Sequence, residues 1–443
     1  MKQYIRLTKE TILKSRYNKF YLINTKNEKK ERFLVEDETL SVLRFLLEGN
    51  SVKKTSQTFP LSPKELIDFL SSLEKKELIE WVNSPYNSTS KCFDIEPPLD
   101  SLNILLTNAC NLHCLHCYRE SGKKSNSELK GKDWIEVLKQ AQNLGVFALN
   151  ISGGEPLLHP DFWMITEYIA SIPTFNANLN TNGTIPIEKN KRKLLSRAFK
   201  SIQVSIDHIN PEEHDLFRGQ KNSWKKAIKT VQQLISWGIK VNIGFTLTPQ
   251  NFSILEKMVS FCQKIGVSEL HIGLLTNIGR GKNLPSVEKN KKFLETVYNQ
   301  LLIINRLKIN IQILSPFRFF DYSSISFEKK KYICDGDNTQ ILYLLPEGTA
   351  VPCDKLPKEI FGYGNIKKQS LLEIWKGKKM RSFKLMKLKN IPKCHRCPRL
   401  SICGGPCLAR SFWEKGLLNS PDTIACFMAK KIEKLIKGGN NES

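Results

Sequence analysis

Three cysteines placed directly after an apolar run constrain this 443-residue chain more than any other feature. Cys110, Cys114 and Cys117 follow the spacing C-x3-C-x2-C, and the run 102–106 before them is typical of a buried β-strand. A short loop that leaves a strand can direct three thiolates at one point. Thiolates are the usual protein ligands of iron–sulfur clusters, so three of them on a four-iron cluster leave one iron open. The stretch therefore predicts a metal cluster with a free coordination position.

Two other interpretations of this stretch stay open. Structural zinc usually takes four nitrogen or sulfur ligands, and His113 or His116 could supply the fourth. The three cysteines could also be buried thiols that bind nothing. The cluster prediction is preferred because structural zinc cysteines usually come as C-x2-C with a distant second pair.

Strand-like and helix-like runs alternate from Leu102 to about Asn277. We expect strands at 102–106, 148–152, 176–180, 201–206, 240–246 and 269–274. We expect helices at 132–144, 162–171, 191–198, 224–237 and 254–265. This alternation predicts an α/β fold with a parallel sheet, here a partial (β/α)6 TIM-type barrel over residues 101–310. The site of such a barrel lies at the carboxyl ends of its strands, which is where the cysteine loop begins.

The pattern of apolar runs and turns likewise predicts a separate module over residues 1–85. Apolar runs at 19–24 and 31–36 flank a polar turn, as in a β-hairpin. Helical patterns follow at 39–47, at 52–59 and after Ser62, which is placed as an N-cap with proline next to it. With a closing strand at 78–81, these elements predict a winged-helix module. The polar, proline-containing residues 86–100 predict a linker.

The last part of the chain holds seven of the twelve cysteines. They are Cys334, Cys353, Cys394, Cys397, Cys403, Cys407 and Cys426. Two structural zinc ions would need eight ligands, so a histidine such as His395 would have to help. Two iron–sulfur clusters, one with an incomplete set of cysteines, fit the same count. Residues 311–443 are therefore predicted to be a bridging region and a cysteine-rich iron–sulfur domain.

Composition limits the cellular setting. No apolar run approaches the ~20 residues needed to span a bilayer, and the first residues contain no apolar signal core. These features predict a cytoplasmic protein without a membrane partner, whose cysteines serve as metal ligands rather than disulfides. The 68 basic and 43 acidic residues give a net charge of +25. That charge permits an anionic partner but fits a lysine-rich solvated surface equally well.

The cysteine spacing followed by the aromatic Tyr118 resembles the cluster loop of the radical S-adenosylmethionine (radical SAM) enzymes. In that family the open iron binds the amino and carboxylate groups of SAM, and reductive cleavage gives a 5′-deoxyadenosyl radical. The resemblance implies that the three cysteines hold a 4Fe-4S cluster. It also implies that Tyr118 packs beside the cluster or the adenine.

Short polar motifs after the later strands extend this resemblance to SAM binding. Gly153-Gly154-Glu155 is similar to the family motif that binds the SAM amino group. By order along the chain, Asn182, Ser205 and Asp207 are expected to contact the ribose or the methionyl group. Arg218 is similarly expected to reach the SAM carboxylate. Each motif taken alone fits a turn or a helix cap equally well.

The C-terminal spacing, with Gly364–Ile366 and Leu371–Trp375, resembles the SPASM domain of radical SAM enzymes that act on peptides and proteins. The resemblance implies three 4Fe-4S clusters in all, one that binds SAM and two auxiliary. It assigns the outer auxiliary cluster to Cys394, Cys397, Cys403 and Cys426, and the inner one to Cys334, Cys353 and Cys407. The inner set lacks a fourth cysteine, so an iron is open there or is bound by Asp335 or Asp337.

These resemblances imply a maturase that modifies a ribosomally made precursor peptide. The N-terminal module is similar to peptide-recognition elements in which a leader peptide adds a strand to a sheet edge. The expected product is a thioether, as in sactipeptide-type maturases, with a flavodoxin- or ferredoxin-type protein as reductant and no nucleic-acid partner.

Two alternatives remain. Asp354, directly after Cys353, resembles the proton-accepting aspartate of maturases that oxidise a sulfatase cysteine or serine to formylglycine, and is the candidate catalytic residue. The N-terminal module argues against that activity. The winged-helix pattern and the +25 charge would also fit an iron–sulfur DNA-binding regulator.

Overall fold

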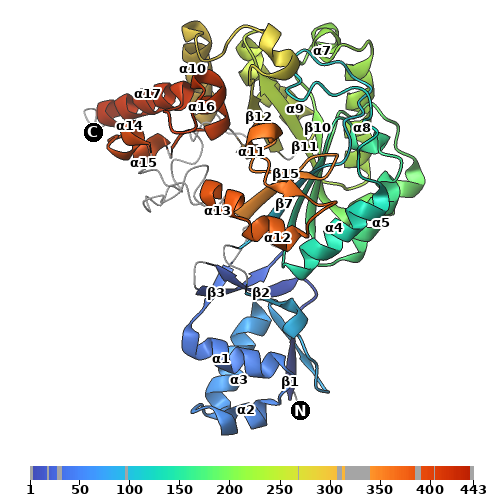
Figure 1. Cartoon of the computed structure of the whole chain (residues 1–443), viewed down its shortest axis with the longest axis vertical. Helices are drawn as coiled ribbons and strands as arrows, with labels where there is room; N and C mark the ends of the chain where they lie inside the picture. Colours follow the sequence, from blue (N-terminus) through green and yellow to red (C-terminus); the bar gives the residue numbers. More distant parts are fainter. Residues whose placement is uncertain are drawn as a thin grey trace.

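The computed structural model of the chain describes residues 3–16, 19–26, 32–94, 98–267, 269–306, 312–314, 340–384, 391–403 and 405–439. Figure 1 shows a central sheet with helices along one side, a small module at one end, and a helical C-terminal region beside the other end. No helix among these described residues is long and apolar enough to cross a membrane.

A ten-stranded sheet forms the centre of the described chain, in the order β13-β12-β11-β10-β9-β8-β7-β14-β15-β16. Strands β7 to β13 are parallel to their neighbours, and β14 also pairs in parallel with β7. The strands are β7 Ser101–Leu105, β8 Ala148–Ser152, β9 Asn176–Thr181, β10 Phe199–Ser205, β11 Val241–Leu247, β12 Glu269–Leu274, β13 Gln312–Leu314, β14 Ile341–Leu344, β15 Thr349–Val351 and β16 Gly364–Asn365. The six strands predicted from the alternation are therefore all present, and the parallel α/β sheet is confirmed.

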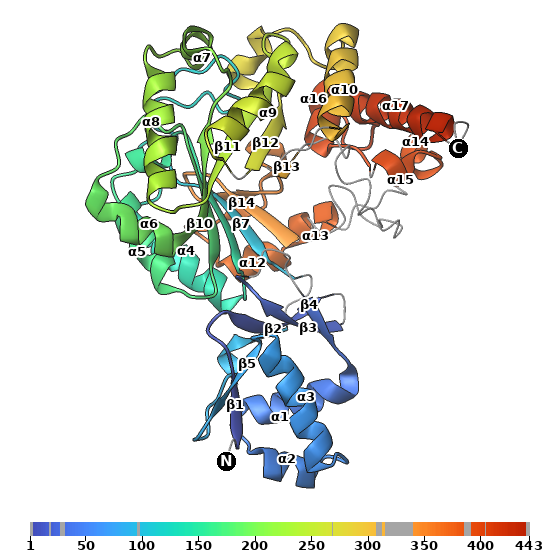
Figure 2. The ribbon, with the colours of Figure 1, turned by 180° about the vertical axis from the view of Figure 1, so that it is seen from behind.

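Helices that follow these strands cover the outer side of the sheet (Figure 2). They are α4 Gly131–Asn143, α5 Phe162–Ser171, α6 Arg192–Ala198, α7 Pro211–Arg218, α8 Ser223–Ser236 and α9 Leu255–Lys264, with 3-10 turns η2 Pro156–Leu158, η3 Lys189–Lys191 and η4 Phe252–Ile254. Their apolar faces and the strands share one core, in which Trp134 of α4 is fully buried. Sequence analysis missed helix α7, although its capping residue Asn210, the proline after it and its acidic first turn are helix-start signals.

The N-terminal module contains the predicted hairpin and three helices. Its elements are β1 Tyr4–Leu7, β2 Thr11–Arg16, β3 Lys19–Asn24, β4 Arg32–Val35, α1 Asp37–Leu47, α2 Val52–Thr58, α3 Pro63–Lys75 and β5 Ile79–Val82. Strand β3 pairs antiparallel with β4, as expected. Ser62 and Glu65 form a reciprocal capping box at the start of α3, which confirms the predicted N-cap.

The strands of the module form two sheets. One is the pair β1-β5 and the other has the order β4-β3-β2-β6, so the winged-helix topology stays a prediction. Part of the predicted linker belongs to the second sheet, because η1 Thr89–Lys91 leads into β6 Cys92–Phe93, which pairs in parallel with β2. Polar composition and prolines gave no signal for this two-residue strand.

The module is attached to the amino ends of the barrel strands. The ammonium group of Lys14 on β2 lies 3.0 Å from a carboxylate oxygen of Asp100 and donates to the carbonyls of Leu99 and Gly145. Asn176, the first residue of β9, donates through its side chain to the carbonyl of Thr25 at 2.9 Å. An apolar cluster of Ile12, Ile23 and Phe147 fills the same junction. The module therefore lies at the foot of the barrel, opposite the carboxyl ends of the strands (Figures 1 and 2).

The chain after the barrel is mostly helical. Its described elements, besides the strands above, are η5 Gly279–Asn283, α10 Lys291–Arg306, α11 Lys358–Phe361, α12 Leu371–Lys376, α13 Lys378–Lys384, α14 Pro392–His395, α15 Leu400–Cys403, α16 Leu408–Lys415 and α17 Thr423–Gly439. Helix α17 packs on α10 and α15. Strands β13 and β14 join the barrel sheet at opposite edges, so the sheet extends past the expected boundary at residue 310. The predicted ligand Cys334, with Asp335 and Asp337, lies outside the described residues.

Candidate functional site

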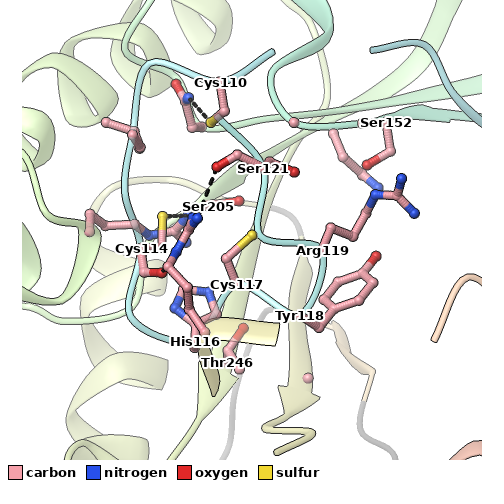
Figure 3. Close-up of a pocket in the computed structure, with 18 of the residues that line it drawn as sticks. Cys110, Cys114, His116, Cys117, Tyr118, Arg119, Ser121, Ser152, Ser205 and Thr246 are labelled. Carbon is pink, nitrogen blue, oxygen red and sulfur yellow. Dashed lines mark hydrogen bonds between the residues drawn. The ribbon is translucent and has the colours of Figure 1, made fainter. Parts of the chain in front are cut away.

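A cavity of about 230 Å³ lies at the carboxyl ends of the barrel strands. Cys110, Cys114 and Cys117 line it together (Figure 3). The other wall residues come from the ends of successive strands and from the loops behind them: Ser152, Gly153, Gly154, Asn180, Thr181, Asn182, Ser205, Thr246, Leu274, Arg218, Arg280, Tyr118 and Lys355. This is the position expected for the site of a parallel barrel, and it unites motifs separated by more than a hundred residues in the chain.

The glycines of the segment after β8 let it dock directly on the cysteine loop. The N–H of Gly154 donates to the carbonyl of Thr107 at 2.7 Å, and the N–H of Glu155 donates to that of Ala109 at 2.8 Å. A Cβ on Gly154 would lie 2.3 Å from the Ala109 oxygen, inside any allowed contact. Gly153 has φ +151°, and a Cβ there would lie 2.6 Å from the Thr107 oxygen. Both glycines are therefore required by the close approach of two backbones.

Two further glycine segments hold the other side of the loop. Gly219, with φ +67° at the end of α7, would place a Cβ 2.6 Å from the His113 oxygen. Gly279, with φ +54°, would place one 2.6 Å from the Cys117 oxygen. Next to it, the guanidinium of Arg280 donates to the carbonyls of Cys114 and Ser121 at 2.9 and 3.0 Å. The cysteine loop is thus fixed by its backbone, which leaves the thiols to face the cavity.

Sequence analysis missed Arg280 and also Glu128, which supports the start of the loop. The buried carboxylate of Glu128 accepts hydrogen bonds from the hydroxyl of Thr107 at 2.7 Å and the N–H of Asn108 at 2.9 Å. A single acidic residue in a polar stretch gives no sequence signal for such a role. Gly279-Arg280-Gly281 likewise has the composition of an ordinary loop.

Glu155 lies behind the cavity wall and holds the end of β9. Its carboxylate accepts hydrogen bonds from the Thr181 hydroxyl at 2.8 Å and from the N–H groups of Asn182 and Leu157 at 2.7 and 3.2 Å. Burial raises the pKa of Glu155 to about 7, against the lowering effect of these donors. Glu155 therefore places Asn182, and its expected contact with SAM stays a prediction.

Asn182, on the cavity wall, reaches the cysteine loop with its side chain. The amide nitrogen donates to the side-chain oxygen of Asn111 at 2.9 Å and lies 3.9 Å from the sulfur of Cys110. Ser205 lines the cavity at the end of β10. Both predicted contact residues are thus at the site.

Asp207 and Arg218 form a buried ion pair beside Cys114. The carboxylate of Asp207 lies 2.6 Å from Nη2 of Arg218, and Nη1 of Arg218 donates to the sulfur of Cys114 at 3.8 Å. Burial alone would raise the pKa of Asp207, but Arg218 and His116 lower it below its usual value. Asp207 is fully occupied behind the wall, while Arg218 faces the cavity. We therefore regard Asp207 as a residue that orients Arg218.

Burial keeps His116 neutral at this site. It stacks on Phe217 with ring centroids 4.6 Å apart, and its pKa is lowered to about 4, mainly by burial. A neutral imidazole could bind a metal, but this ring is committed to the stack and lies 3.6 Å from Asp207. His113 is exposed at the surface of the loop.

Tyr118 connects the cysteine loop to the C-terminal region. Its hydroxyl donates a hydrogen bond to the carboxylate of Asp354, and the ammonium group of Lys355 lies 5.6 Å from its ring centroid. Burial, followed by the charge of Asp354, raises the pKa of Tyr118 well above its ordinary value. The predicted catalytic residue Asp354 is therefore held against the cavity, because Tyr118 and Lys355 both line it.

The donor chemistry of the cavity fits an iron–sulfur cluster. Burial raises the pKa of Cys110 to about 11 and raises that of Cys114 as well, which favours the protonated form of these two thiols. Metal binding would release these protons. No three His, Cys, Asp or Glu side chains in the described ranges converge as a ready-made set for one metal ion. Three thiols spaced around a shared cavity suit a four-iron cluster, in which three of the irons would each take one thiol.

Four C-terminal cysteines lie near one another. The pKa of Cys394 is raised to about 11 by burial and then by Cys426 and Cys397, and that of Cys403 is raised to about 11 by burial with contributions from Cys426 and Cys394. These mutual effects group the four residues assigned to the outer auxiliary cluster. The pKa of Cys353 is raised by burial, by the charge of Asp354 and more weakly by Cys407. Two of the three inner-set cysteines therefore lie near each other.

Comparison with known families identifies both halves of this arrangement. Residues 104–262 match the model of the radical SAM superfamily, and residues 334–398 match that of SPASM, an iron–sulfur cluster-binding domain.

The chain is similar to characterised proteins over most of its length. It is 29% identical over 355 residues to the antilisterial bacteriocin subtilosin biosynthesis protein AlbA of Bacillus subtilis, covering 76% of this chain and 74% of AlbA. It is 26% identical over 327 residues to the mycofactocin maturase MftC of Mycolicibacterium smegmatis, covering 72% of this chain and 80% of MftC.

A solved structure shows the same fold over nearly the whole chain. The crystal structure of Streptococcus suis SuiB bound to S-adenosylmethionine superposes with a TM-score of 0.69 at 18% identity, covering 95% of this chain and 99% of SuiB. SuiB has also been crystallised with its precursor peptide SuiA, and that structure matches with a TM-score of 0.68 at 16% identity and 95% and 99% coverage.

Proposed function

This chain combines a radical SAM domain with a SPASM iron–sulfur domain, and from that combination we propose that it modifies a ribosomally made precursor peptide. The observation that carries the proposal is the cavity in which three cysteines of one loop meet the ends of five barrel strands. AlbA and MftC, named for bacteriocin biosynthesis and mycofactocin maturation, support the class of substrate.

Cys110, Cys114 and Cys117 would hold a 4Fe-4S cluster with one open iron for SAM. When bound, cluster and SAM supply the one-electron chemistry that removes a hydrogen atom from the substrate. The chain orients SAM through Asn182, Ser205 and Arg218 on the wall, with Gly153 and Gly154 allowing close backbone approach. Glu155 and Asp207 support these residues from behind the cavity wall, since Glu155 accepts a hydrogen bond from Asn182 and Asp207 pairs with Arg218. Tyr118 packs beside the bound group.

The C-terminal domain would hold two auxiliary clusters, three clusters in all. Cys394, Cys397, Cys403 and Cys426 form the outer set, and Cys334, Cys353 and Cys407 form the inner set. An inner set with three cysteines leaves a position where a substrate thiol could bind and lose its proton. A thioether between that sulfur and a carbon of the peptide is the product we propose. The 5′-deoxyadenosyl radical would take the hydrogen atom from that carbon, the thiol would lose its proton, and an auxiliary cluster would accept the remaining electron.

The N-terminal module would bind the leader of the precursor. Strand β4 is an edge of its sheet, and Leu34 on it is 43% exposed, so an extended peptide can add as a further strand. SuiB, which has the same fold, was crystallised with its precursor peptide. Because the module is fixed to the foot of the barrel, the peptide must run along the barrel to reach the cavity. Tethering raises the effective concentration of the core peptide to roughly millimolar for a short flexible linker.

We further propose a cytoplasmic setting, a flavodoxin- or ferredoxin-type reductant, and no nucleic-acid or membrane partner. An electron donor is required because SAM cleavage is reductive. The cavity and the module account for the enzyme and its peptide without a nucleic acid.

The test is anaerobic reconstitution with iron and sulfide, followed by SAM and a strong reductant. The full chain should release 5′-deoxyadenosine, and a chain with Cys110, Cys114 and Cys117 changed to alanine should not. With a cysteine-containing precursor from a neighbouring gene, the product should lose two hydrogens and resist thiol alkylation. Zinc in place of iron, together with no 5′-deoxyadenosine, would refute the proposal.

Formylglycine formation is the second candidate, favoured by one observation. Asp354 follows Cys353 and is held by Tyr118 at the cavity, where it could accept a proton from a substrate cysteine or serine. The same mass analysis separates the two functions, because formylglycine replaces the thiol with an aldehyde. A precursor product that reacts with a hydrazide probe would favour this second candidate.

A further inference from the structure

Asp422 occupies the junction between the two proposed sets of auxiliary cysteines. It is the N-cap residue of α17, directly before Thr423, and its side chain is completely buried between α16 and α17. One of the two helices begins after Cys407 and the other contains Cys426. Sequence analysis did not single out Asp422, because an aspartate after a proline fits an ordinary helix start.

On one side, the carboxylate holds the segment of Cys407. Its oxygen Oδ2 accepts the N–H of Cys407 at 3.1 Å and two N–H groups of Arg410, Nε at 2.9 Å and Nη2 at 2.6 Å. Cys407 is itself the N-cap residue of α16. This one oxygen therefore fixes both the backbone of an inner-set cysteine and the arginine one turn after it.

On the other side, the same residue holds the segment of Cys426. Oδ1 accepts the N–H groups of Ile424 and Ala425 at 3.0 and 3.1 Å, which caps α17. The carbonyl of Asp422 accepts the N–H of Cys426 at 3.0 Å. The start of the helix, and with it the direction of the Cys426 side chain, depends on Asp422.

Arg410 brings a buried positive charge to this junction. Its side chain is 14% exposed, and its charge interacts with both Asp422 and Cys407. A buried ion pair that loses one partner leaves an uncompensated charge, so neither residue can be neutralised without disturbing the other. The pair also places a cation next to a thiolate of the inner set, where charge affects the reduction potential of a cluster.

We propose that Asp422, with Arg410, couples the two auxiliary clusters, so that both sets of cysteines are held in binding geometry together or lost together. This inference rests on the assignment of the cysteines in the proposed function. Asp422 and Arg410 are positioning residues in it, since neither supplies a ligand. A simple helix cap would affect the Cys426 side alone.

The experiment uses the full chain, reconstituted anaerobically, with iron and sulfide counts and EPR spectra of the reduced protein. Cys353→Ala and Cys403→Ala give reference spectra in which only the inner or only the outer set is damaged. Asp422→Ala should lower iron to about one third of wild type, the share of the barrel cluster, and remove both auxiliary signals. SAM cleavage by the barrel should persist, which shows that the chain has folded.

Asp422→Asn keeps an oxygen for the helix cap but removes the charge that pairs with Arg410. We expect it to change the EPR signals of both sets in parallel. Glu414→Gln is the matched control, because Glu414 lies on the same helix as Arg410 and accepts a hydrogen bond from Thr423, the neighbour of Asp422. It should keep wild-type iron and spectra.

Two results would overturn the coupling. One is a loss of iron and EPR signal confined to one set in Asp422→Ala, and the other is wild-type iron and spectra in both Asp422 variants. The proposed function fails in a different way. In that case the wild-type chain would hold no auxiliary iron, or Cys353→Ala and Cys403→Ala would leave its iron content unchanged.

Discussion

The hydroxyl of Tyr118, one residue after the last cysteine of the barrel loop, donates a hydrogen bond to the carboxylate of Asp354, one residue after Cys353. The two residues are 236 positions apart in the chain, and most of the barrel lies between them. Through this bond the barrel loop and the C-terminal domain meet at the cavity. Because burial keeps the phenol protonated far above neutral pH, it remains a donor throughout the working range.

If Asp354 is the base of the second candidate function, Asp354→Asn should separate SAM cleavage from peptide modification. The amide can still accept a hydrogen bond from Tyr118, so the packing is kept, but it cannot take a proton from the substrate. Peptide turnover should fall by roughly 10²- to 10⁴-fold, the usual contribution of a general base, while 5′-deoxyadenosine is still released. The two products can be followed together by mass spectrometry in one reaction.

Glu359→Gln, on the neighbouring helix α11, is the control and should retain both activities. An Asp354→Asn enzyme that modifies peptide at the wild-type rate would show that Asp354 has no role as a base.

Gly154→Ala should remove the cluster of the barrel. The added Cβ would meet the Ala109 carbonyl at 2.3 Å, and a backbone atom cannot move aside as a flexible side chain can. The cysteine loop must then shift, so iron bound by the barrel and SAM cleavage should both drop by more than about 10-fold, since displacement of catalytic groups by about 1 Å costs roughly 10² in rate. Iron analysis and 5′-deoxyadenosine release measure the two effects.

Gly122→Ala is the matched control for that loop. Gly122 lies in the same segment, and its N–H and carbonyl bond to Asn108 and Cys110, but a Cβ there would meet nothing within 4 Å. This variant should bind iron as wild type does. Equal iron in the two variants would contradict the claim that close backbone approach fixes the loop.

The sequence predicted the barrel well because each predicted strand carries buried residues at regular positions and lies between turn signals. All six predicted strands are present, two of them with the expected bounds, β8 and β12. Strands such as β6 and β16 are two residues long, and they exist only because an edge strand offers hydrogen-bonding partners. No local composition reports such a partner.

The same difference between local signals and distant partners applies to the site residues. The cysteines and glycines could be predicted because their spacing reflects a local constraint on the backbone. For Glu155 and Asp207, position along the chain gave the correct strand end, and it carries no information on the direction of the carboxylate. Donors on neighbouring strands decide that direction, because a buried carboxylate must be hydrogen-bonded or paired. Sequence analysis did not identify Asp422 and Glu128 for the same reason.

His214 predicts a pH dependence of stability. Burial, with Arg218 next, lowers the pKa of His214 to about 4, and its Nδ1 accepts the N–H of Asp207 at 3.3 Å. Between pH 6.5 and 4 the unfolded chain therefore binds a proton at His214 that the folded chain excludes, so the contribution of His214 to the free energy of unfolding falls as pH falls. His116 acts in the same direction, and Glu155, whose pKa is raised, acts in the opposite one. The loss should be on the order of 2 kcal/mol across this window and should be absent above pH 7.

His214→Asn keeps an acceptor near the Asp207 N–H and removes the titrating group. Urea unfolding at pH 7.5 and pH 5.0, followed by circular dichroism, should show a smaller difference between the two pH values for the variant than for wild type. His208→Asn serves as control, because His208 is a half-buried histidine whose Nδ1 also accepts a backbone N–H. A variant whose stability falls with pH as steeply as wild type would exclude His214 as the source.

Lys14→Met should loosen the N-terminal module from the barrel. Lys14 is completely buried, and its ammonium group pairs with Asp100 and donates to carbonyls that precede β7 and β8, so methionine leaves a buried carboxylate with one fewer partner. Breaking a buried pair in this way costs about 3–5 kcal/mol. Lys26→Met is the control in the same sheet, because the Lys26–Glu10 pair lies at the surface, where such pairs contribute about 0–1 kcal/mol. Limited proteolysis is the measurement that checks this loosening. It should cut Lys14→Met between the module and the barrel, and leave wild type and Lys26→Met intact. If the module guides the leader along the barrel, Lys14→Met should also slow peptide modification and leave SAM cleavage unchanged. Equal proteolysis of both lysine variants would mean that the junction is held by its apolar cluster instead.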